Sequence, residues 1–216
     1  NLTFHGISLT YLIEKYGTPF RFIYLPKIRD QIKKARNLFN RAIKKNNYRG
    51  KYHYCFCTKC NHFSHVVSEA LKHEVHLETS SAFDIDLILK LYSEGKIDKK
   101  RTIVNNGYKT DDYLRKIVDL IEFGFENVIL VLDSKTEMAR IKELNCSKKI
   151  KIGIRMAINE EPQASFYTSR LGIANTDLIE FYHSEIENEE SVELVMLHFF
   201  VDSGIKDTIY YWGEFM

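Results

Sequence analysis

The sequence alternates between short runs of strand-forming residues and longer stretches in which apolar residues recur at helical spacing. After an opening run at residues 19–25 and a helical stretch around residues 28–42, this alternation repeats six times. Each repeat takes about 25 to 40 residues, a length that is typical of parallel strands joined by helical crossovers. Only 10 glycines and 3 prolines occur among the 216 residues, so little of the sequence is suited to linkers or low-complexity segments.

The predicted strands are rich in β-branched and aromatic residues, and they cover residues 19–25, 52–58, 75–79, 102–105, 127–132, 150–157 and 192–201. The predicted helices carry their apolar residues on one face, and they cover residues 28–42, 62–73, 82–92, 111–123, 134–144 and 176–182. A last helix is expected to begin at Lys206. Ser134 and Glu137 have the spacing of a capping box at the start of a helix.

Six such units fit either an open, doubly wound sheet or an incomplete eight-stranded barrel. The sequence contains no G-x-G-x-x-G or Walker-type loop, which disfavours the open sheet. A complete barrel needs about 250 residues, so this chain is about two strands short of one. The sequence therefore predicts an α/β fold, a partial TIM-like (β/α)8 barrel with about six of its eight units.

The first strand of the predicted barrel ends on a lysine. Alternation along this strand places Tyr54 and Phe56 on one face, which would pack beneath helices, and Cys55 and Cys57 on the other. Lys59 follows on the face of the two cysteines, which we expect to point into the barrel. Active sites of such barrels collect at the carboxyl ends of the strands, where a lysine could form a Schiff base. The alternative for this lysine is a solvated charge at the rim.

Other polar side chains reach the ends of the later strands. Glu78 lies near the end of the second strand, Asn106 follows the third, and Arg155 and His198 lie on the fifth and sixth. Their arrival at one rim indicates a ligand site, because the carboxyl ends of parallel strands meet at one edge. Two simpler interpretations stay open at this point: a structural ion pair between Glu78 and Arg155, and a hydrogen-bonded core role for His198.

The chain has four cysteines, which are too few for a disulfide framework and indicate a reduced, cytoplasmic protein. Three of them lie together at Cys55, Cys57 and Cys60. With His62 they include enough ligand types for zinc. However, Cys55 and Cys57 would lie about 7 Å apart along one strand, and no second Cys-x-x-Cys or histidine pair completes a structural site. We therefore expect no metal and interpret the cysteines as small buried thiols.

Charge and hydropathy exclude two further classes of protein. The 31 Lys and Arg residues against 29 Asp and Glu residues give a net charge of +2, without a basic block that would bind nucleic acid. No apolar run approaches the roughly 20 residues that cross a bilayer, and mean hydropathy is −0.29, so we expect no membrane span. The first residues lack the features of a signal peptide, and the absence of an initiator Met suggests a fragment.

Several motifs, in this order, resemble those of the fold-type III pyridoxal-phosphate (PLP) amino-acid decarboxylases. They are residues 16–20, the Lys59-Cys60-Asn61 segment, residues 78–84, the Asn-x-x-Lys segment 106–109, the Ile154-Arg155 strand and residues 169–173. Residues 77–84, 167–172 and 197–200 look most like bacterial biosynthetic arginine decarboxylases. The resemblance covers nearly the whole chain and implies the truncated PLP-binding barrel of that family.

The resemblance also implies roles for individual residues. Lys59 would carry PLP as an internal aldimine, Glu78 and Arg155 would line the cofactor pocket, and Ser203 would approach the phosphate. The chain departs from the usual His-x-Gly-Ser pattern of the sixth strand, because it has Phe200 and Asp202 where the family has histidine and glycine. Either Phe200 or His198 would then cover the cofactor ring. A carboxylate at Asp202 near a phosphate is electrostatically unfavourable unless a cation intervenes.

As a member of this family, the complete protein would decarboxylate a basic amino acid, L-arginine to agmatine in polyamine biosynthesis, as a homodimer or higher homo-oligomer. Ornithine, lysine, diaminopimelate and carboxynorspermidine are alternative substrates, and a non-catalytic regulatory module is the alternative from another class. A racemase is disfavoured by the long region before Lys59. Residues 1–25 would form an entry segment that pairs with an absent C-terminal β-domain, and residues 26–216 the barrel domain, which alone would be inactive.

Overall fold

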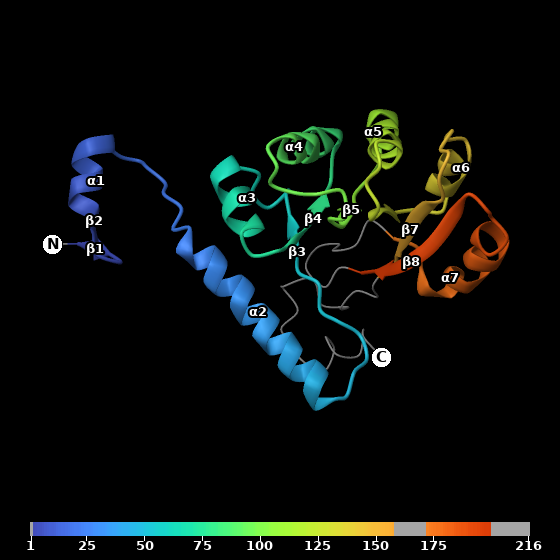
Figure 1. The fold of residues 1–216 in the computed structure, drawn as a ribbon, viewed down its shortest axis with the longest axis horizontal. Helices are drawn as coiled ribbons and strands as arrows, with labels where there is room; N and C mark the ends of the chain where they lie inside the picture. The colour runs from blue at the N-terminus through green and yellow to red at the C-terminus, as the bar shows by residue number, and fades with distance from the viewer. Residues whose placement is uncertain (1, 158–171, 200–216) are drawn as a thin grey trace.

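The computed structural model describes residues 2–157 and 172–199, and its centre is a six-stranded parallel sheet (Figure 1). The strands follow chain order across the sheet: β3 (Cys55–Cys57), β4 (His76–Thr79), β5 (Ile103–Asn105), β6 (Val128–Leu132), β7 (Ile150–Arg155) and β8 (Val192–His198). Parallel neighbours in chain order, each reached through a helix, are the arrangement of a (β/α)8 barrel. The predicted partial barrel is therefore confirmed.

Helices lie on the convex side of the curved sheet, as Figure 1 shows. They are α3 (Ser64–Leu71), α4 (Ala82–Ser93), α5 (Asp111–Glu122), α6 (Thr136–Lys142) and α7 (Asn175–Phe181), which continues into the π-helical turn η1 (Tyr182–Ile186). We call the sheet face beneath these helices the outer face and the opposite one the inner face. Each predicted strand and helix between residues 52 and 198 is present, with shifted ends.

The outer face forms the hydrophobic core because each strand presents an apolar residue to the helices at every second position. Leu77 pairs with Ile103, and Leu130 pairs with Ile152, and all four are fully buried. Phe56 in β3 and Tyr54 just before it pack against this cluster, as the alternation of the sequence predicts. The opposite residues of the same strands, including Cys57, Glu78 and Arg155, therefore face inward.

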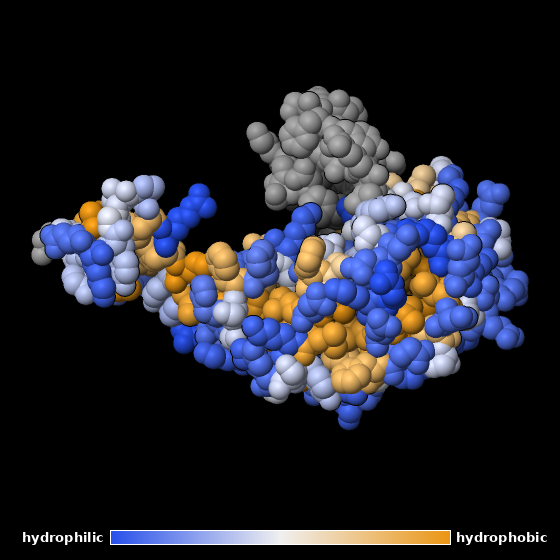
Figure 2. Space-filling model, turned by 90° about the horizontal axis from the view of Figure 1, so that it is seen from above, coloured by the Kyte–Doolittle hydropathy of each residue, from blue (hydrophilic) through white to orange (hydrophobic). Residues whose placement is uncertain are grey.

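The N-terminal segment differs from the prediction. No strand forms at residues 19–25, whereas β1 (Thr3–Phe4), β2 (Ile7–Ser8) and α1 (Leu9–Tyr16) were not predicted. A strand needs a hydrogen-bonded neighbour, and the described residues supply none beside this run. The segment projects away from the barrel (Figures 1 and 2) and connects to it through α2 (Pro26–Lys45).

The predicted capping box at Ser134 is wrong. Helix α6 begins two residues later, and the Ser134 hydroxyl lies 2.9 Å from the Thr136 hydroxyl instead of bonding the Glu137 backbone. The Glu137 carboxylate instead accepts hydrogen bonds from the backbone N–H groups of Asp133 (2.7 Å) and Lys109 (3.2 Å). The Glu137 carboxylate also accepts a hydrogen bond from the buried amine of Lys109. The sequence pattern around Glu137 gives no sign of this lysine, which lies 28 positions earlier.

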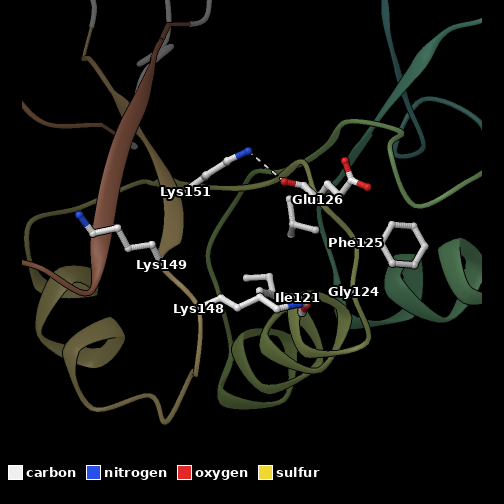
Figure 3. A pocket seen from close by; sticks show the side chains of 8 residues that line it. Ile121, Gly124, Phe125, Glu126, Lys148, Lys149 and Lys151 are labelled. Carbon is white, nitrogen blue, oxygen red and sulfur yellow. Dashed lines mark hydrogen bonds between the residues drawn. The ribbon is translucent and has the colours of Figure 1, made fainter.

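The amino end of the sheet contains a hollow of about 250 Å³ between α5, β6 and β7 (Figure 3). Lys148 donates to the Ile121 carbonyl at 3.0 Å, and Lys151 donates to the Glu126 carbonyl at 2.9 Å. These ammonium groups satisfy carbonyls at the carboxyl end of α5 and in the turn that follows it. The amino end of such a barrel contributes to stability, whereas ligands bind at the other end.

Within residues 2–157 and 172–199, none of the helices has the length and apolar composition that a membrane span requires.

Candidate active site at the carboxyl ends of the strands

Three side chains from three strand ends form a connected polar group on the inner face. The Asn106 side-chain amide donates to Glu78 Oε1 at 3.0 Å and lies 3.3 Å from His198 Nε2. Glu78 is the penultimate residue of β4, Asn106 directly follows β5, and His198 ends β8. The fold thus brings together residues that lie up to 120 positions apart in the sequence. All three were expected at one rim, and Glu78 and His198 were also predicted to line the cofactor site.

The hydrogen-bond pattern fixes the protonation of His198. Asn106 must direct its NH2 group at Glu78, because its carbonyl oxygen would be repelled by the carboxylate. The second amide proton then points to Nε2 of His198, so this nitrogen is the acceptor and Nδ1 carries the proton. Burial lowers the pKa of His198, which favours the same neutral form. Both the Nδ1 donor and the Asn106 carbonyl oxygen are buried, and neither has a hydrogen-bond partner among residues 2–157 and 172–199.

Arg155 lies next to His198, because the two residues pair in the register of β7 and β8. Its ion-pair partner is Asp133, with 3.6 Å between Nη1 and Oδ1. The alternative ion pair between Arg155 and Glu78 is therefore not formed. Neither Asp133 oxygen has a hydrogen-bond partner in the described part of the chain, although the carboxylate is buried.

A returning segment of the chain joins the ends of β6 and β7. Gly172 donates its N–H to the Asp133 carbonyl, and Ile173 donates to the Arg155 carbonyl, each at 2.8 Å. Gly172 has φ of +112°, and a Cβ there would lie 2.7 Å from the Ala157 nitrogen, so only glycine fits. This contact fixes the backbone of both charged residues at the rim of the barrel.

Lys59 lies two residues beyond the end of β3, in a turn that the Cys60 N–H closes by donating to the Cys57 carbonyl at 3.2 Å. The preceding Thr58 is fully buried and donates its hydroxyl to the Glu78 carbonyl at 3.0 Å. These bonds anchor the end of β3 beside the end of β4. The Lys59 side chain is exposed and forms no ion pair with another described residue. Its assignment as the cofactor lysine stays a prediction.

The two cysteines on β3 have thiol groups whose pKa values are raised, which disfavours the reactive thiolate form. Burial raises the pKa of both Cys55 and Cys57 to about 11, with a further contribution from the Glu78 carboxylate. All four cysteines of the chain are free. Among residues 2–157 and 172–199, no group of three or more His, Cys, Asp or Glu side chains is arranged to hold a metal ion.

Some sequence-predicted site residues lie outside the described part of the chain. These are Phe200, Asp202 and Ser203, together with residues 167–171 of the Ser-Arg-Leu-Gly motif.

Three residues that the structure brings to this rim had no site role predicted from the sequence: Lys109, Asp133 and Glu137. The Asn-x-x-Lys segment, which also contains Asn106, held a signal for Lys109. Asp133 directly follows the predicted strand at residues 127–132, just as Lys59 directly follows the predicted strand at residues 52–58. Glu137 could not be found, because its spacing from Ser134 fits an ordinary helix cap.

The polar groups of the rim fit a planar, anionic, aldehyde-bearing cofactor. The Nδ1 donor of His198 and the Asn106 carbonyl are buried and have no partner among the described residues. Arg155 carries a positive charge, and Lys59, beyond the end of β3, has an exposed primary amine. Unpartnered polar groups at the mouth of a barrel are those that a bound ligand would satisfy.

The fold, with its polar groups gathered at the carboxyl rim, places the chain among the (β/α)8 barrel proteins. A family model described as "Pyridoxal-dependent decarboxylase, pyridoxal binding domain" matches residues 26–213. Because this match covers most of the sequence, the chain belongs to the pyridoxal-dependent decarboxylases, and the fold-type III resemblance is confirmed.

Its relatives include arginine decarboxylases. Biosynthetic arginine decarboxylase of Prochlorococcus marinus is 26% identical over 221 residues, which cover 94% of this chain and 33% of that protein. Biosynthetic arginine decarboxylase of Synechococcus sp. is 26% identical over 220 residues, again covering 94% of this chain and 33% of that protein. The chain thus spans about a third of the length of the curated relatives it matches.

Solved structures show the same fold. Diaminopimelate decarboxylase of M. jannaschii, in complex with L-lysine, superimposes with a TM-score of 0.73 at 20% identity, covering 97% of this chain and 48% of that one. Biosynthetic arginine decarboxylase of Campylobacter jejuni gives a TM-score of 0.70 at 20% identity, covering 97% of this chain and 35% of that one.

Proposed function

We propose that the protein containing this chain decarboxylates a basic amino acid, L-arginine to agmatine, with PLP bound at the carboxyl rim of the barrel. The observation that carries the proposal is the linked Glu78–Asn106–His198 group beside Arg155, at the same rim as Lys59, within a pyridoxal-binding domain. Arginine is the proposed substrate because the relatives named above are arginine decarboxylases.

In this proposal each residue has a separate role. Lys59 binds the cofactor through its amine, Arg155 attracts the negative charge of the ligand, and neutral His198 offers its Nδ1 donor and the face of its ring. Glu78 fixes the Asn106 amide, which in turn keeps His198 in one tautomer. When bound, PLP supplies the electron sink that accepts the charge left by the departing carboxylate.

Ser203 and Phe200 complete the proposed site, next to the phosphate and the ring respectively. The active protein is proposed to be a homodimer or a higher homo-oligomer in the cytoplasm, with residues 26–216 as its barrel domain and residues 1–25 as the entry segment.

The test is a titration of the protein, produced from its full coding sequence, with PLP. We expect PLP to acquire the visible absorbance band of a lysine-bound aldehyde in the wild type, and the band to be lost in Lys59→Ala. Lys135→Ala, a second exposed lysine beyond another strand, is the matched control and keeps the band. Persistence of the band in Lys59→Ala would refute the role of Lys59.

Release of agmatine from L-arginine then tests the substrate. We expect turnover of arginine to exceed that of ornithine, lysine, diaminopimelate or carboxynorspermidine by at least about tenfold, equivalent to about 1.4 kcal/mol in the activation barrier. A preference for another of these amino acids would change the substrate and leave the cofactor site standing. Bound PLP with no product from any of them would favour a regulatory module.

A further inference from the structure

Four charged side chains form a buried set behind the site. Lys109 is fully buried, the side chains of Asp133 and Glu137 are each 2% exposed, and that of Arg155 is 12% exposed. Lys109 Nζ donates to the Val131 carbonyl and to Glu137 Oε2, the latter at 3.3 Å. Two positive and two negative groups leave the set neutral. Burying ions is costly, and an apolar replacement would often be as stable, so stability alone is a weak reason for such a set.

The set joins three strand ends. Glu137 accepts the backbone N–H groups of Lys109, after β5, and of Asp133, after β6. Arg140 adds a bond from its guanidinium to the Lys109 carbonyl at 2.6 Å. The Gly172 N–H holds the Asp133 carbonyl from the other side. The backbone of Asp133 is therefore fixed by two independent hydrogen bonds.

This fixation has a consequence for Arg155. The 3.6 Å between Arg155 Nη1 and Asp133 Oδ1 exceeds the approximately 2.8 Å of a charge-assisted hydrogen bond. Asp133 thus attracts the guanidinium from beyond hydrogen-bond distance, and within the described part of the chain the Asp133 oxygens have no hydrogen-bond partner. A shift of Asp133 toward Arg155 would allow the two side chains to form a direct hydrogen-bonded pair.

We infer that Lys109 and Glu137 are positioning residues for the ligand site, which fix Asp133 so that Arg155 stays short of hydrogen bonding and available to an anionic ligand group. The inference rests on the proposed PLP site, whose ligand is an organic phosphate. Neither Lys109 nor Glu137 needs to contact that ligand.

The test compares paired substitutions in the protein made from its full coding sequence. Lys109→Met with Glu137→Gln removes both buried charges together and leaves no ion uncompensated. Lys116→Met with Asp86→Asn makes the same exchange at an ion pair of 2.7 Å that is partly exposed, and serves as the control. We expect the buried double variant to bind PLP about tenfold more weakly than the wild type, and the control to bind it equally well.

A purely structural role would lower affinity independently of Arg155, so the same pair is also combined with Arg155→Gln. Residues that act through one another are not additive, and we expect the combination to bind PLP no more weakly than Arg155→Gln alone. Additive losses would overturn the inference.

A milder variant and a crystallographic distance test the inference if the double variant is unstable or if PLP does not bind. Glu137→Gln alone is the milder variant, because it keeps Lys109 and the hydrogen bond from its amine to the Val131 carbonyl. Crystal structures without ligand should show the distance between Arg155 and Asp133 shortening to about 2.8 Å in either variant. An unchanged distance contradicts the inference, whereas failure of wild-type PLP binding contradicts only the proposed function.

Discussion

The two faces of the sheet differ in whether their buried polar groups are hydrogen-bonded. On the outer face every strand residue beneath the helices is apolar or fully hydrogen-bonded, as in the buried group formed by the Thr79 hydroxyl with Asn105 Oδ1 (2.8 Å) and the Tyr113 hydroxyl (2.7 Å). On the inner face, buried polar atoms of Asn106, Asp133 and His198 have no hydrogen-bond partner within the residues that the structure describes. Satisfied groups stabilise the fold, and unsatisfied groups indicate where a ligand binds.

The largest expected effect is on the outer face. Leu130→Ala should lower the free energy of unfolding by about 2 to 5 kcal/mol, because Leu130 is fully buried in the middle of the core. Leu197→Ala, at a leucine that is 57% exposed on the edge strand β8, is the control and should cost less than about 1 kcal/mol. Urea denaturation measures both. Equal losses would mean that the outer face is not the core of the fold.

Next comes the polar group buried on the outer face. Tyr113→Phe removes the hydroxyl that meets Thr79 and should cost about 1 to 2 kcal/mol, because Thr79 loses a buried partner. Tyr108→Phe, at an exposed tyrosine, should leave the free energy of unfolding unchanged within about 0.5 kcal/mol. A neutral Tyr113→Phe would show that this group contributes nothing, and the contrast between the faces would weaken.

A smaller effect is expected on the inner face. The Glu78 carboxylate helps to raise the pKa of Cys55 and Cys57, so Glu78→Gln should lower both values while burial keeps them above those of an exposed thiol. Alkylation of these thiols at fixed pH should then become about two- to tenfold faster, the size of a moderately screened charge interaction. Cys146, which lies beside Glu122 on the outer side, is the internal control. Unchanged rates would mean that Glu78 does not act electrostatically there.

The smallest effect concerns the pH dependence of stability. Burial lowers the pKa of His198, so below the ordinary value of about 6.5 the unfolded state binds its proton more readily than the folded state. The free energy of unfolding should therefore decrease as pH falls below about 6.5, and less steeply in His198→Gln. Urea titrations at several pH values measure this, with His183→Gln as the exposed control. An identical slope in wild type and His198→Gln would contradict the buried, neutral histidine.

Much of the barrel could be predicted because its strands alternate strictly and its crossovers have regular lengths. Leu77 and Glu78 are neighbours in one strand, so their side chains must lie on opposite faces of the sheet, because side chains alternate with a period of two. Whether residues 19–25 form a strand could not be predicted in this way. Their local pattern is typical of a strand, but a strand also needs a hydrogen-bonded neighbour. The side-chain position of Glu137 could not be predicted for the same reason. Its spacing from Ser134 fits a helix cap, but its carboxylate bonds Lys109, which lies 28 positions earlier.

The order of the six β/α units, the apolar outer face and the polar residues at the strand ends could all be predicted from the amino-acid sequence. Those properties follow from local periodicity and from the chemistry of single residues. The hydrogen bonds that join Glu78 and His198 through Asn106, and the pairing of Arg155 with Asp133 instead of Glu78, became known only from the folded chain. Such pairings depend on the register and curvature of the sheet, which place side chains from distant strands within a few ångströms of one another.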